Sequence, residues 1–466
     1  MKSALLFLST LLLATLQAPP TPNASLSGRL KGSSGAVSAP GPVSGSVAIG
    51  TLGYRDGRRV FQSNGSAQAD ALGNYSFASV GPGEYYIRAE SLPTRGIPTY
   101  YPGTADIDSA TKISVGPGQE IVGIDFDASS PPTFKISGTV RGIPASTATT
   151  GLTNAILGMA FASTDSRSPD PSAGPLLQTT RGGANGEFEV SLPAGEWDLF
   201  PVIPIRQAGA PTPGAAGGGA VGMPIYATGR ARVRLVDRNV ENVVITVGSA
   251  DIKGRIVIPG SPQGEFVPPV PIRVTLLPDG NYPSPLVSHL RTPQSVGTAG
   301  EFVFAAVPPG RYVFQILPIP SDHYLADMRV GSKSIYDDGV ITVATEPVDP
   351  VEVVLRRGGG GVRVTVRGQD SAAAVGGSLR RIVVMPVEVR RENALLYRTV
   401  FPGSFPFVVS ALAPGRYKVF AFQELPPGGA EQNAEFMAKH EDFGVPIDVG
   451  EGQTVDVQVP WIPAGK

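Results

Sequence analysis

The chain of 466 residues contains no cysteine, and this absence removes several kinds of chemistry. It excludes a disulfide framework, a thiol nucleophile and a cysteine that could carry a lipid anchor. The domains must therefore be held together by burial of apolar surface alone. A domain of about 110 residues buries enough surface for this.

Histidine is nearly absent as well, with only His289, His323 and His440 in the whole chain. None of the three belongs to an HxxE or HExxH motif. A zinc hydrolase needs several histidine and glutamate ligands around an open coordination position, and most nucleophile pairs use histidine as the base. We therefore expect no catalytic residues, no metal site and no cofactor. A Ser/Lys site or a pair of carboxylates stays open, although no spacing points to either.

No excess of charge of either sign is present: 38 Lys and Arg stand against 39 Asp and Glu, for a formal net charge of -1. The basic residues are scattered, with only local pairs such as Arg380-Arg381 and Arg390-Arg391. A nucleic-acid-binding surface requires clustered positive charge. We therefore expect no nucleic-acid partner.

Long apolar runs are missing except in the first residues, "MKSALLFLSTLLLATLQAPP". Lys2 precedes an apolar stretch over residues 4–16, and small residues follow near Ala18. This pattern is typical of a secretory signal peptide, here residues 1–19, and is too short to span a membrane. The cleavage position stays open because a cut after Ala18 would place Leu16 where a small residue is preferred. We expect a secreted, periplasmic or cell-envelope protein without a transmembrane anchor once the signal is removed.

Glycine and proline are abundant, with 58 and 46 copies, and they punctuate a phrase that occurs four times. The copies are "VGPGEYYI" (80–87), "LPAGEWDL" (192–199), "VPPGRYVF" (307–314) and "LAPGRYKV" (412–419). Their conserved glycines lie 112, 115 and 105 residues apart, which is about one domain length. The spacing predicts four domains over residues 20–131, 132–248, 249–358 and 359–466.

Alternating apolar residues surround the phrase, as in "GEFVFAAVPPGRYVF" (300–314), and period two is typical of strands. Pro309-Gly310 predicts a type II turn, so each phrase is interpreted as a β-hairpin corner with inward aromatics. Each domain opens on a strand such as "ISGTV" (136–140), whose glycine leaves room for a backbone or a large ring. It closes on another, such as "VEVVL" (351–355). Short linkers predict an extended row of domains.

These repeats resemble the carboxypeptidase regulatory-like domain, a transthyretin-like (prealbumin-like) β-sandwich, and the tandem arrays of such domains in secreted bacterial proteins. The resemblance implies about seven strands in two packed sheets per domain and does not carry peptidase activity with it. The expected fold class is therefore all-β, with four tandem Ig-like/transthyretin-like β-sandwich domains. The helical composition of "AEQNAEFMAKHEDFG" (430–444) predicts one short helix in the last domain.

Exposed aromatic rings are the candidate binding residues, because the apolar face of a sugar stacks on a ring. The speculative ligand-binding residues are Tyr86, Tyr100, Tyr101 and Trp461, with Tyr54 as a further candidate. A matching aromatic follows the phrase in every domain, for example Tyr226 and Tyr324, so core packing is the competing interpretation. Related sandwiches bind starch-like glycans, which makes carbohydrate binding an alternative function.

The sequence contains residues suited to two further chemistries. Asp106, Asp108, Asp125 and Asp127 could offer oxygen ligands to calcium, but no ligand-rich loop is present, so solvent-facing carboxylates are favoured. Lys135 and Lys253 could join isopeptide bonds, but outward lysines are favoured.

The leading hypothesis is a non-catalytic exported bacterial protein, a structural or ligand-binding spacer array whose partner is a polysaccharide or a cell-surface protein. A carbohydrate-binding protein is second, and an enzyme with an unrecognised site is third.

Overall fold

The computed structural model describes residues 23–464 except for 33–40, 43, 92–97, 105–106, 129–132, 144–155, 164–175, 182–185, 206–224, 261–270, 281, 283, 321, 368–379 and 404–405. The expected signal peptide, residues 1–19, lies outside the described residues, as does Asp106. Strand pairing stays within each of the four expected segments, and we call them domain 1 to domain 4.

Domains 1 and 2 are built almost entirely from strands. The elements of domain 1 are β1 (Ala24–Gly32), β2 (Gly41–Pro42), β3 (Gly45–Arg55), β4 (Arg58–Gln68), β5 (Asn74–Val80), β6 (Gly83–Ser91), β7 (Thr99–Tyr100), η1 (Ile107–Ser109), β8 (Ile113–Val115), β9 (Glu120–Ile121) and β10 (Phe126–Asp127). Those of domain 2 are β11 (Thr133–Arg141), β12 (Ile156–Ser163), β13 (Leu176–Arg181), β14 (Glu187–Pro193), β15 (Gly195–Ile205), β16 (Ile225–Ala227), β17 (Ala231–Leu235) and β18 (Val240–Thr246).

Domains 3 and 4 add short helices to the same plan. The elements of domain 3 are β19 (Ala250–Val257), β20 (Arg273–Pro278), α1 (Ser284–Arg291), β21 (Gln294–Ser295), β22 (Glu301–Val307), β23 (Gly310–Leu317), β24 (His323–Val330), β25 (Lys333–Ser334), β26 (Val340–Val343) and β27 (Val351–Arg357). Those of domain 4 are β28 (Gly360–Val366), β29 (Arg381–Pro386), η3 (Glu388–Glu392), η4 (Ala394–Leu396), β30 (Arg398–Val400), β31 (Phe407–Leu412), β32 (Gly415–Phe422), η5 (Ala430–Gln432), α2 (Ala434–Lys439), η6 (Glu441–Phe443), β33 (Val445–Val449), β34 (Thr454–Val459) and β35 (Trp461–Ile462).

Each domain packs two sheets face to face, which confirms the predicted all-β fold of tandem sandwiches. In the first sheet the opening strand is central: it pairs antiparallel with the strand before the phrase and parallel with the closing strand, as in β22-β19-β27 and β31-β28-β34. The second sheet contains the strand after the phrase, as in β21-β20-β23-β26. Apolar side chains that alternate along these strands meet between the sheets and form the cores.

The hairpin interpretation of the repeated phrase is wrong. The strands on its two sides do not pair with each other: β22 pairs with β19, whereas β23 pairs with β20 and β26 in the other sheet. The turn is not type II either, because the phrase glycines Gly83, Gly195 and Gly415 have φ of 157°, 147° and 156° rather than about 80°. The phrase therefore carries the chain across the sandwich, from one sheet to the other.

The aromatic residue of the phrase stabilises the crossing, which is the place where the chain passes from one sheet to the other. In every domain the ring donates a hydrogen bond from its far end to the carbonyl four residues upstream, much like the tyrosine corner of other sandwiches. The four bonds are Tyr85 to Gly81 (3.0 Å), Trp197 to Pro193 (2.9 Å), Tyr312 to Pro308 (2.8 Å) and Tyr417 to Ala413 (2.6 Å). Tryptophan replaces tyrosine in domain 2 without loss of the bond, since its indole N–H is also a donor.

The glycine of the opening strand packs as predicted. A Cβ on Gly138 would lie 1.9 Å from the carbonyl oxygen of Val243, and one on Gly254 would lie 2.3 Å from the ring of Phe302. Domain 4 has Val364 at this place, and the ring opposite it, Phe407, is only half-buried instead of buried. The glycine therefore makes room for an aromatic ring in the core.

The predicted helix in residues 430–444 is confirmed as α2, flanked by η5 and η6. Helix α1 in domain 3 was not predicted. Its buried residues Leu286, Val287 and Leu290 lie on one face over the core, and Pro285 stands in the first turn, where proline is tolerated.

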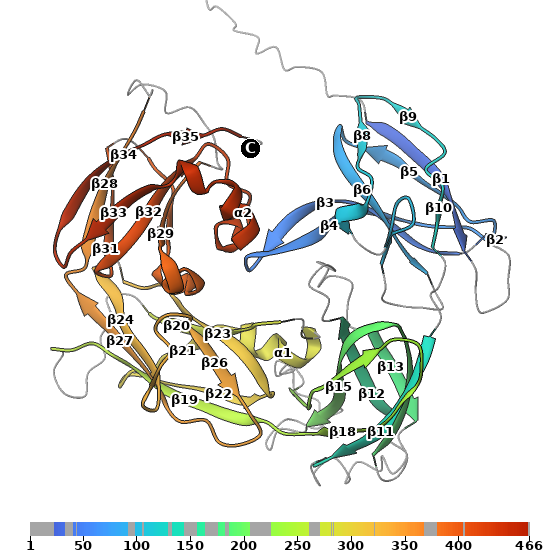
Figure 1. The fold of residues 1–466 in the computed structure, drawn as a ribbon, viewed down its shortest axis with the longest axis horizontal. Helices are drawn as coiled ribbons and strands as arrows, with labels where there is room; N and C mark the ends of the chain where they lie inside the picture. The colour runs from blue at the N-terminus through green and yellow to red at the C-terminus, as the bar shows by residue number, and fades with distance from the viewer. Residues whose placement is uncertain are drawn as a thin grey trace, which may run out of the picture.

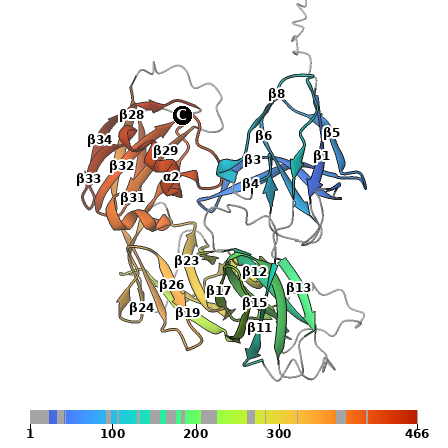
Figure 2. The same ribbon diagram turned by 45° about the vertical axis from the view of Figure 1, so that its right-hand side comes forward.

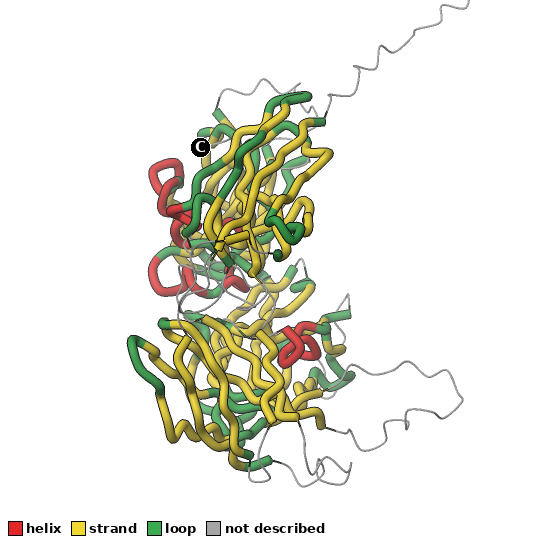
Figure 3. Tube along the Cα trace, turned by 90° about the vertical axis from the view of Figure 1, so that its right-hand side faces the viewer, coloured by secondary structure: helices red, strands yellow, loops and turns green. Residues whose placement is uncertain are grey.

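The expectation of an extended row of domains is wrong. Figure 1 shows the four sandwiches arranged as a ring, with domain 1 (blue) beside domain 4 (red) although they are farthest apart in sequence. Figure 2 shows strands β3 and β4 reaching from domain 1 toward α2. Figure 3 shows how few helical segments the ring contains. The core of domain 3 also continues into its neighbours, through Phe200 of domain 2 and Leu395 and Leu396 of domain 4.

Candidate functional site

The ring is closed by residues 54–59, which comprise the turn between β3 and β4 and the strand ends beside it, and which we call the tip. At its end Asp56 and Gly57 have φ of 50° and 73°, the positive values of a type I′ turn. Asp-Gly is a preferred pair for this turn because both residues tolerate that conformation. The β3–β4 pairing runs out to Arg55 and Arg58, so the hairpin extends without interruption up to the turn.

Domain 4 receives the tip at two glycines before η5. Gly428 and Gly429 have φ of 92° and 86°, and a Cβ on Gly428 would lie 1.9 Å from the carbonyl oxygen of Tyr54. The amide of Gly57 donates to the carbonyl of Gly428 at 3.2 Å. Asn433 donates from Nδ2 to the carbonyl of Gly57 at 3.0 Å. The two backbones therefore touch directly, which only glycine allows at these positions.

Ring packing and burial strengthen this contact. The rings of Tyr54 and Phe436 lie edge to face with centroids 5.6 Å apart, a geometry that is favourable for aromatic pairs. Burial raises the pKa of the Tyr54 hydroxyl, although the charge of Arg59 opposes the shift. Tyr54, a further candidate of the sequence analysis, thus serves contact between domains.

Domain 3 meets the same tip through two ion pairs. Arg58 binds Asp279 at 3.1 Å, and Arg291 at the end of α1 binds Asp56 at 2.8 Å. All four side chains are between 35% and 41% exposed, so each pair contributes at most about 1 kcal/mol. Their main effect is to orient the tip between domains 3 and 4.

A cavity of about 550 Å³ lies at this three-domain junction. Its wall combines the tip with domain 3 residues such as Gln315 and domain 4 residues such as Glu392 and Met437. Carboxylates and guanidinium groups occur side by side, and among the described lining residues there is no histidine, serine or lysine. Within the described residues no group of three metal-ligating side chains occurs. The arrangement of opposite charges is suited to holding the three domains together or to binding a polar ligand.

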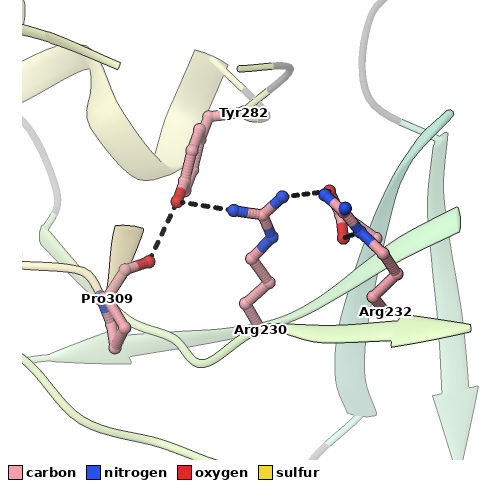
Figure 4. A network of polar contacts seen from close by, with 5 residues as sticks. Arg230, Arg232, Tyr282 and Pro309 are labelled. Atoms are coloured by element: carbon pink, nitrogen blue, oxygen red, sulfur yellow. Dashed lines mark hydrogen bonds and ion pairs between the residues drawn. The ribbon is translucent and has the colours of Figure 1, made fainter. Parts of the chain in front are cut away.

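A second junction joins domains 2 and 3 (Figure 4). Arg230 donates to the buried carboxylate of Asp198 at 2.6 Å and to the hydroxyl of Tyr282 at 3.4 Å. Arg232 binds the same carboxylate at 3.1 Å, and Tyr282 donates to the carbonyl of Pro309 at 3.0 Å. The ring of Tyr282 also packs on Phe200 of domain 2, with centroids 5.2 Å apart. The link therefore ties domain 2 to the phrase of domain 3.

The sequence-predicted aromatic residues do not form one surface. Tyr100 is 0% exposed and Tyr86 is 8% exposed, so the expectation that their rings are exposed is wrong. Both pack with Phe61 in a small cluster of domain 1. The Tyr101 ring is half-buried, and Trp461, also half-buried, lies under the guanidinium of Arg380 at 5.4 Å in domain 4. Their role in ligand binding stays a prediction.

Three of the residues considered for the alternative chemistries, Asp108, Asp125 and Lys135, lie in ordinary surface contacts. Asp125 accepts from Lys31 at 3.2 Å and from the amide of Arg29 at 2.8 Å. Asp108 pairs with Arg59. Lys135 pairs with Glu189 at 2.9 Å.

The tip and its acceptor were missed by the sequence analysis. One signal was available: Asp56-Gly57 stands between two alternating runs, which is a strong hairpin pattern. The double glycine after Pro426-Pro427 marks a turn but says nothing about what approaches it. Contact between segments about 370 residues apart leaves no local trace in the sequence.

No family model matches this chain, and no curated protein matches it. Similar solved structures include a Streptococcal ancillary pilin, at 14% identity over 71% of this chain and 99% of that chain, with a TM-score of 0.20. The minor pilin GBS52 of Streptococcus agalactiae is 11% identical over 48% and 96%, with a TM-score of 0.22. A DUF3823 family protein from Parabacteroides merdae is 17% identical over 40% and 81%, with a TM-score of 0.15. TM-scores this low carry no conclusion about function.

Within the described residues, no helix is long and apolar enough to cross a membrane.

Proposed function

We propose that the chain is a non-catalytic, exported bacterial protein whose four carboxypeptidase regulatory-like sandwiches form a closed scaffold at the cell envelope or outside the cell. The scaffold offers its outer surfaces to a cell-surface protein or a polysaccharide. The signal-peptide pattern of residues 1–19 supports export. The absence of cysteine and the scarcity of histidine support a role without catalysis.

The observation that carries the proposal is the contact of the tip with Gly428 and Asn433. A row of independent modules would not need a hairpin with left-handed glycines on both sides of an interface. Interfaces between domains of one chain are usually small and leave relative motion as the default. Here contacts of domain 1 with domains 3 and 4 hold the ring closed. They favour a function that depends on a fixed arrangement of the four domains.

Closure is tested by comparing two glycine substitutions in domain 4. Gly428→Ala places a Cβ 1.9 Å from the carbonyl of Tyr54, whereas Gly452→Ala meets nothing within 4 Å. Both glycines have positive φ, so both variants carry similar backbone strain. We expect small-angle scattering to show a larger radius of gyration for Gly428→Ala alone. Equal profiles for all three proteins would contradict a closed scaffold, and recovery of the protein in the cytoplasmic fraction would contradict export.

Carbohydrate binding is the second candidate, and Tyr101 and Trp461 are the predicted residues that keep some exposed ring area. The mature chain would be tested on insoluble polysaccharides and a glycan panel beside Tyr101→Ala and Trp461→Ala. Tyr100→Ala removes a buried ring, so it would show how much retention is lost through destabilisation of domain 1 alone. Absence of retention on every glycan would remove this candidate.

A further inference from the structure

The contact that closes the ring is made by two compact surfaces. One is the tip, residues 54–59. The other, which we call the socket, consists of Asp279, Arg291, Gly428, Gly429, Gln432, Asn433 and Phe436. The two surfaces lie on different domains: the tip is the end of a sheet in domain 1, and the socket is formed where domains 3 and 4 meet.

The two surfaces fit each other closely enough to specify their pairing. Gly57 and Gly428 meet backbone to backbone, and a Cβ on Gly57 would lie 2.9 Å from Cβ of Gln432. The charges are complementary, because Asp56 of the tip faces an arginine and Arg58 faces an aspartate. Tyr54 adds a ring contact with Phe436. Packing, hydrogen bonds and charge therefore all favour this tip over an arbitrary loop.

Nothing in these contacts depends on the tip and the socket belonging to the same chain. All are noncovalent, and each is made between side chains or backbone groups that a second copy presents identically. Within one chain the contact is favoured by effective concentration, which depends on how the domains are joined. When the tip leaves the socket of its own chain, the tip of a second copy can bind there through the same contacts. The free energy of these contacts is unchanged, but the association of two chains costs entropy. Exchange of an identical element between copies is a low-cost route to dimers.

We propose that the socket also accepts the tip of a second copy of this chain, so that two chains exchange domain 1 reciprocally and form a two-fold dimer. This inference rests on the closed ring of the proposed function and deepens it by naming a partner. In the dimer every contact of the closed monomer is retained, once in each direction. The balance between monomer and dimer then depends on chain concentration, and it shifts toward the dimer where the protein is crowded at a surface.

The natural absence of cysteine allows a direct test by crosslinking. Cβ atoms of disulfide partners lie about 3.5–4.5 Å apart, whereas a Cβ on Gly57 would lie 2.9 Å from Cβ of Gln432, so the tip must move back by about 0.6 Å for the bond to form. Chains carrying Gly57→Cys alone and Gln432→Cys alone are mixed at about 200 µM and oxidised with copper phenanthroline. We expect the mixed disulfide dimer to exceed, by at least about tenfold, the dimer formed by Gly57→Cys with Gln68→Cys, an exposed position of domain 1.

The double variant Gly57→Cys/Gln432→Cys separates the two proposals. At low concentration it should form an intramolecular disulfide and run as a monomer, and its dimer fraction should rise with concentration. An intramolecular disulfide without a mixed dimer at any concentration would overturn the exchange while leaving the closed ring intact. Absence of both disulfides would overturn the closed ring itself, provided that the reduced double variant gives the same small-angle scattering profile as the unmodified chain.

Light scattering of the unmodified chain gives a second measurement, since cysteine at position 57 could disturb the turn. The dimer fraction should rise between about 10 µM and 500 µM and be lost in Gly428→Ala but kept in Gly452→Ala. A monomer at every concentration, with closure shown by scattering, would overturn the proposal.

Discussion

At the scale of single residues, the aromatic ring of the repeated phrase joins the two sheets of each sandwich. Its apolar body packs in the core, and its polar end satisfies a carbonyl at the place where the chain leaves one sheet. A buried carbonyl without a partner is destabilising by about 1–3 kcal/mol. This explains why the phrase tolerates Tyr and Trp but shows no Phe at this place in any of its four copies.

Tyr312→Phe should therefore destabilise domain 3 by about 1–2 kcal/mol, because the carbonyl of buried Pro308 loses its donor while the ring packing is kept. Tyr85→Phe is the matched control: Tyr85 is only half-buried, so water can replace the hydroxyl. We expect a smaller loss there. Urea unfolding and hydrogen exchange of the crossing would measure both. Equal losses in the two domains would argue against this role of burial.

Gly254→Ala tests the second repeated feature. The new methyl group would lie 2.3 Å from the ring of Phe302 and 2.6 Å from the carbonyl of Val351, so the core must shift. We expect a loss of about 1–3 kcal/mol in the free energy of unfolding of domain 3, typical of overpacking. Gly403→Ala meets nothing within 4 Å and should change stability by less than about 0.5 kcal/mol. Chemical denaturation would measure the free energy of unfolding of both variants, and equal losses would contradict the predicted overpacking at Gly254.

At the scale of elements, the sequence predicts where single strands lie but not which strands pair with them. The opening and closing strands follow from period-two alternation, and the close approach at Gly138 and Gly254 follows from a glycine on an apolar face. The sequence does not distinguish the crossing from a hairpin, because alternation and Pro-Gly look the same whether the next strand pairs with its neighbour or joins the opposite sheet. Tyr86 and Tyr100 are buried instead of exposed because β6 and β7 carry a second apolar layer on the outer face of the sheet.

Helix α1 was missed for a related reason: it is a single short segment whose apolar face is recognisable only against the core that it covers. The socket was missed because it depends on contact between domains 1, 3 and 4. Sequence periodicity reports which face of an element is buried, but it does not report what buries it.

His289 of helix α1 should make the free energy of unfolding of domain 3 depend on pH. Both ring nitrogens of His289 are buried, and burial lowers the pKa of this histidine. The unfolded chain takes up the proton near pH 6.5, whereas the folded domain does so only at lower pH. Below about pH 6.5 the unfolded state binds more protons, so the free energy of unfolding falls as the pH falls; above it the contribution is constant.

Urea midpoints at pH 7.5, 6.0 and 5.0 should therefore decline toward acid pH, and His289→Gln should remove part of this decline. The variant is compared with the wild type at each pH, so that other titrating groups cancel. If both proteins lost stability in parallel, His289 would not be the group responsible.

At the scale of the whole molecule, the ring depends on two kinds of junction. Direct chain neighbours share packed side chains, as where Phe200 enters the core of domain 3. The tip and socket join segments that are distant in sequence and do so mainly through backbone contact at glycines. Small, exposed ion pairs add orientation at the tip but little free energy. The shape is therefore expected to survive moderate salt, whereas a single methyl group at Gly428 opens it.

The junction of domains 2 and 3 should instead depend on charge. Asp198→Ala removes a carboxylate that is 3% exposed and leaves the half-buried Arg230 without its partner. We expect a loss of about 1–3 kcal/mol in domain 2, less than for a fully buried pair because Arg232 reaches solvent. Glu196→Ala, whose pair with Arg234 is exposed on both sides, should have almost no effect. Thermal unfolding and hydrogen exchange around Tyr282 would report both variants. An unchanged exchange rate at Tyr282 in Asp198→Ala would show that the packing of Phe200, Val202 and Tyr226 on the core of domain 3 holds the two domains together without this carboxylate.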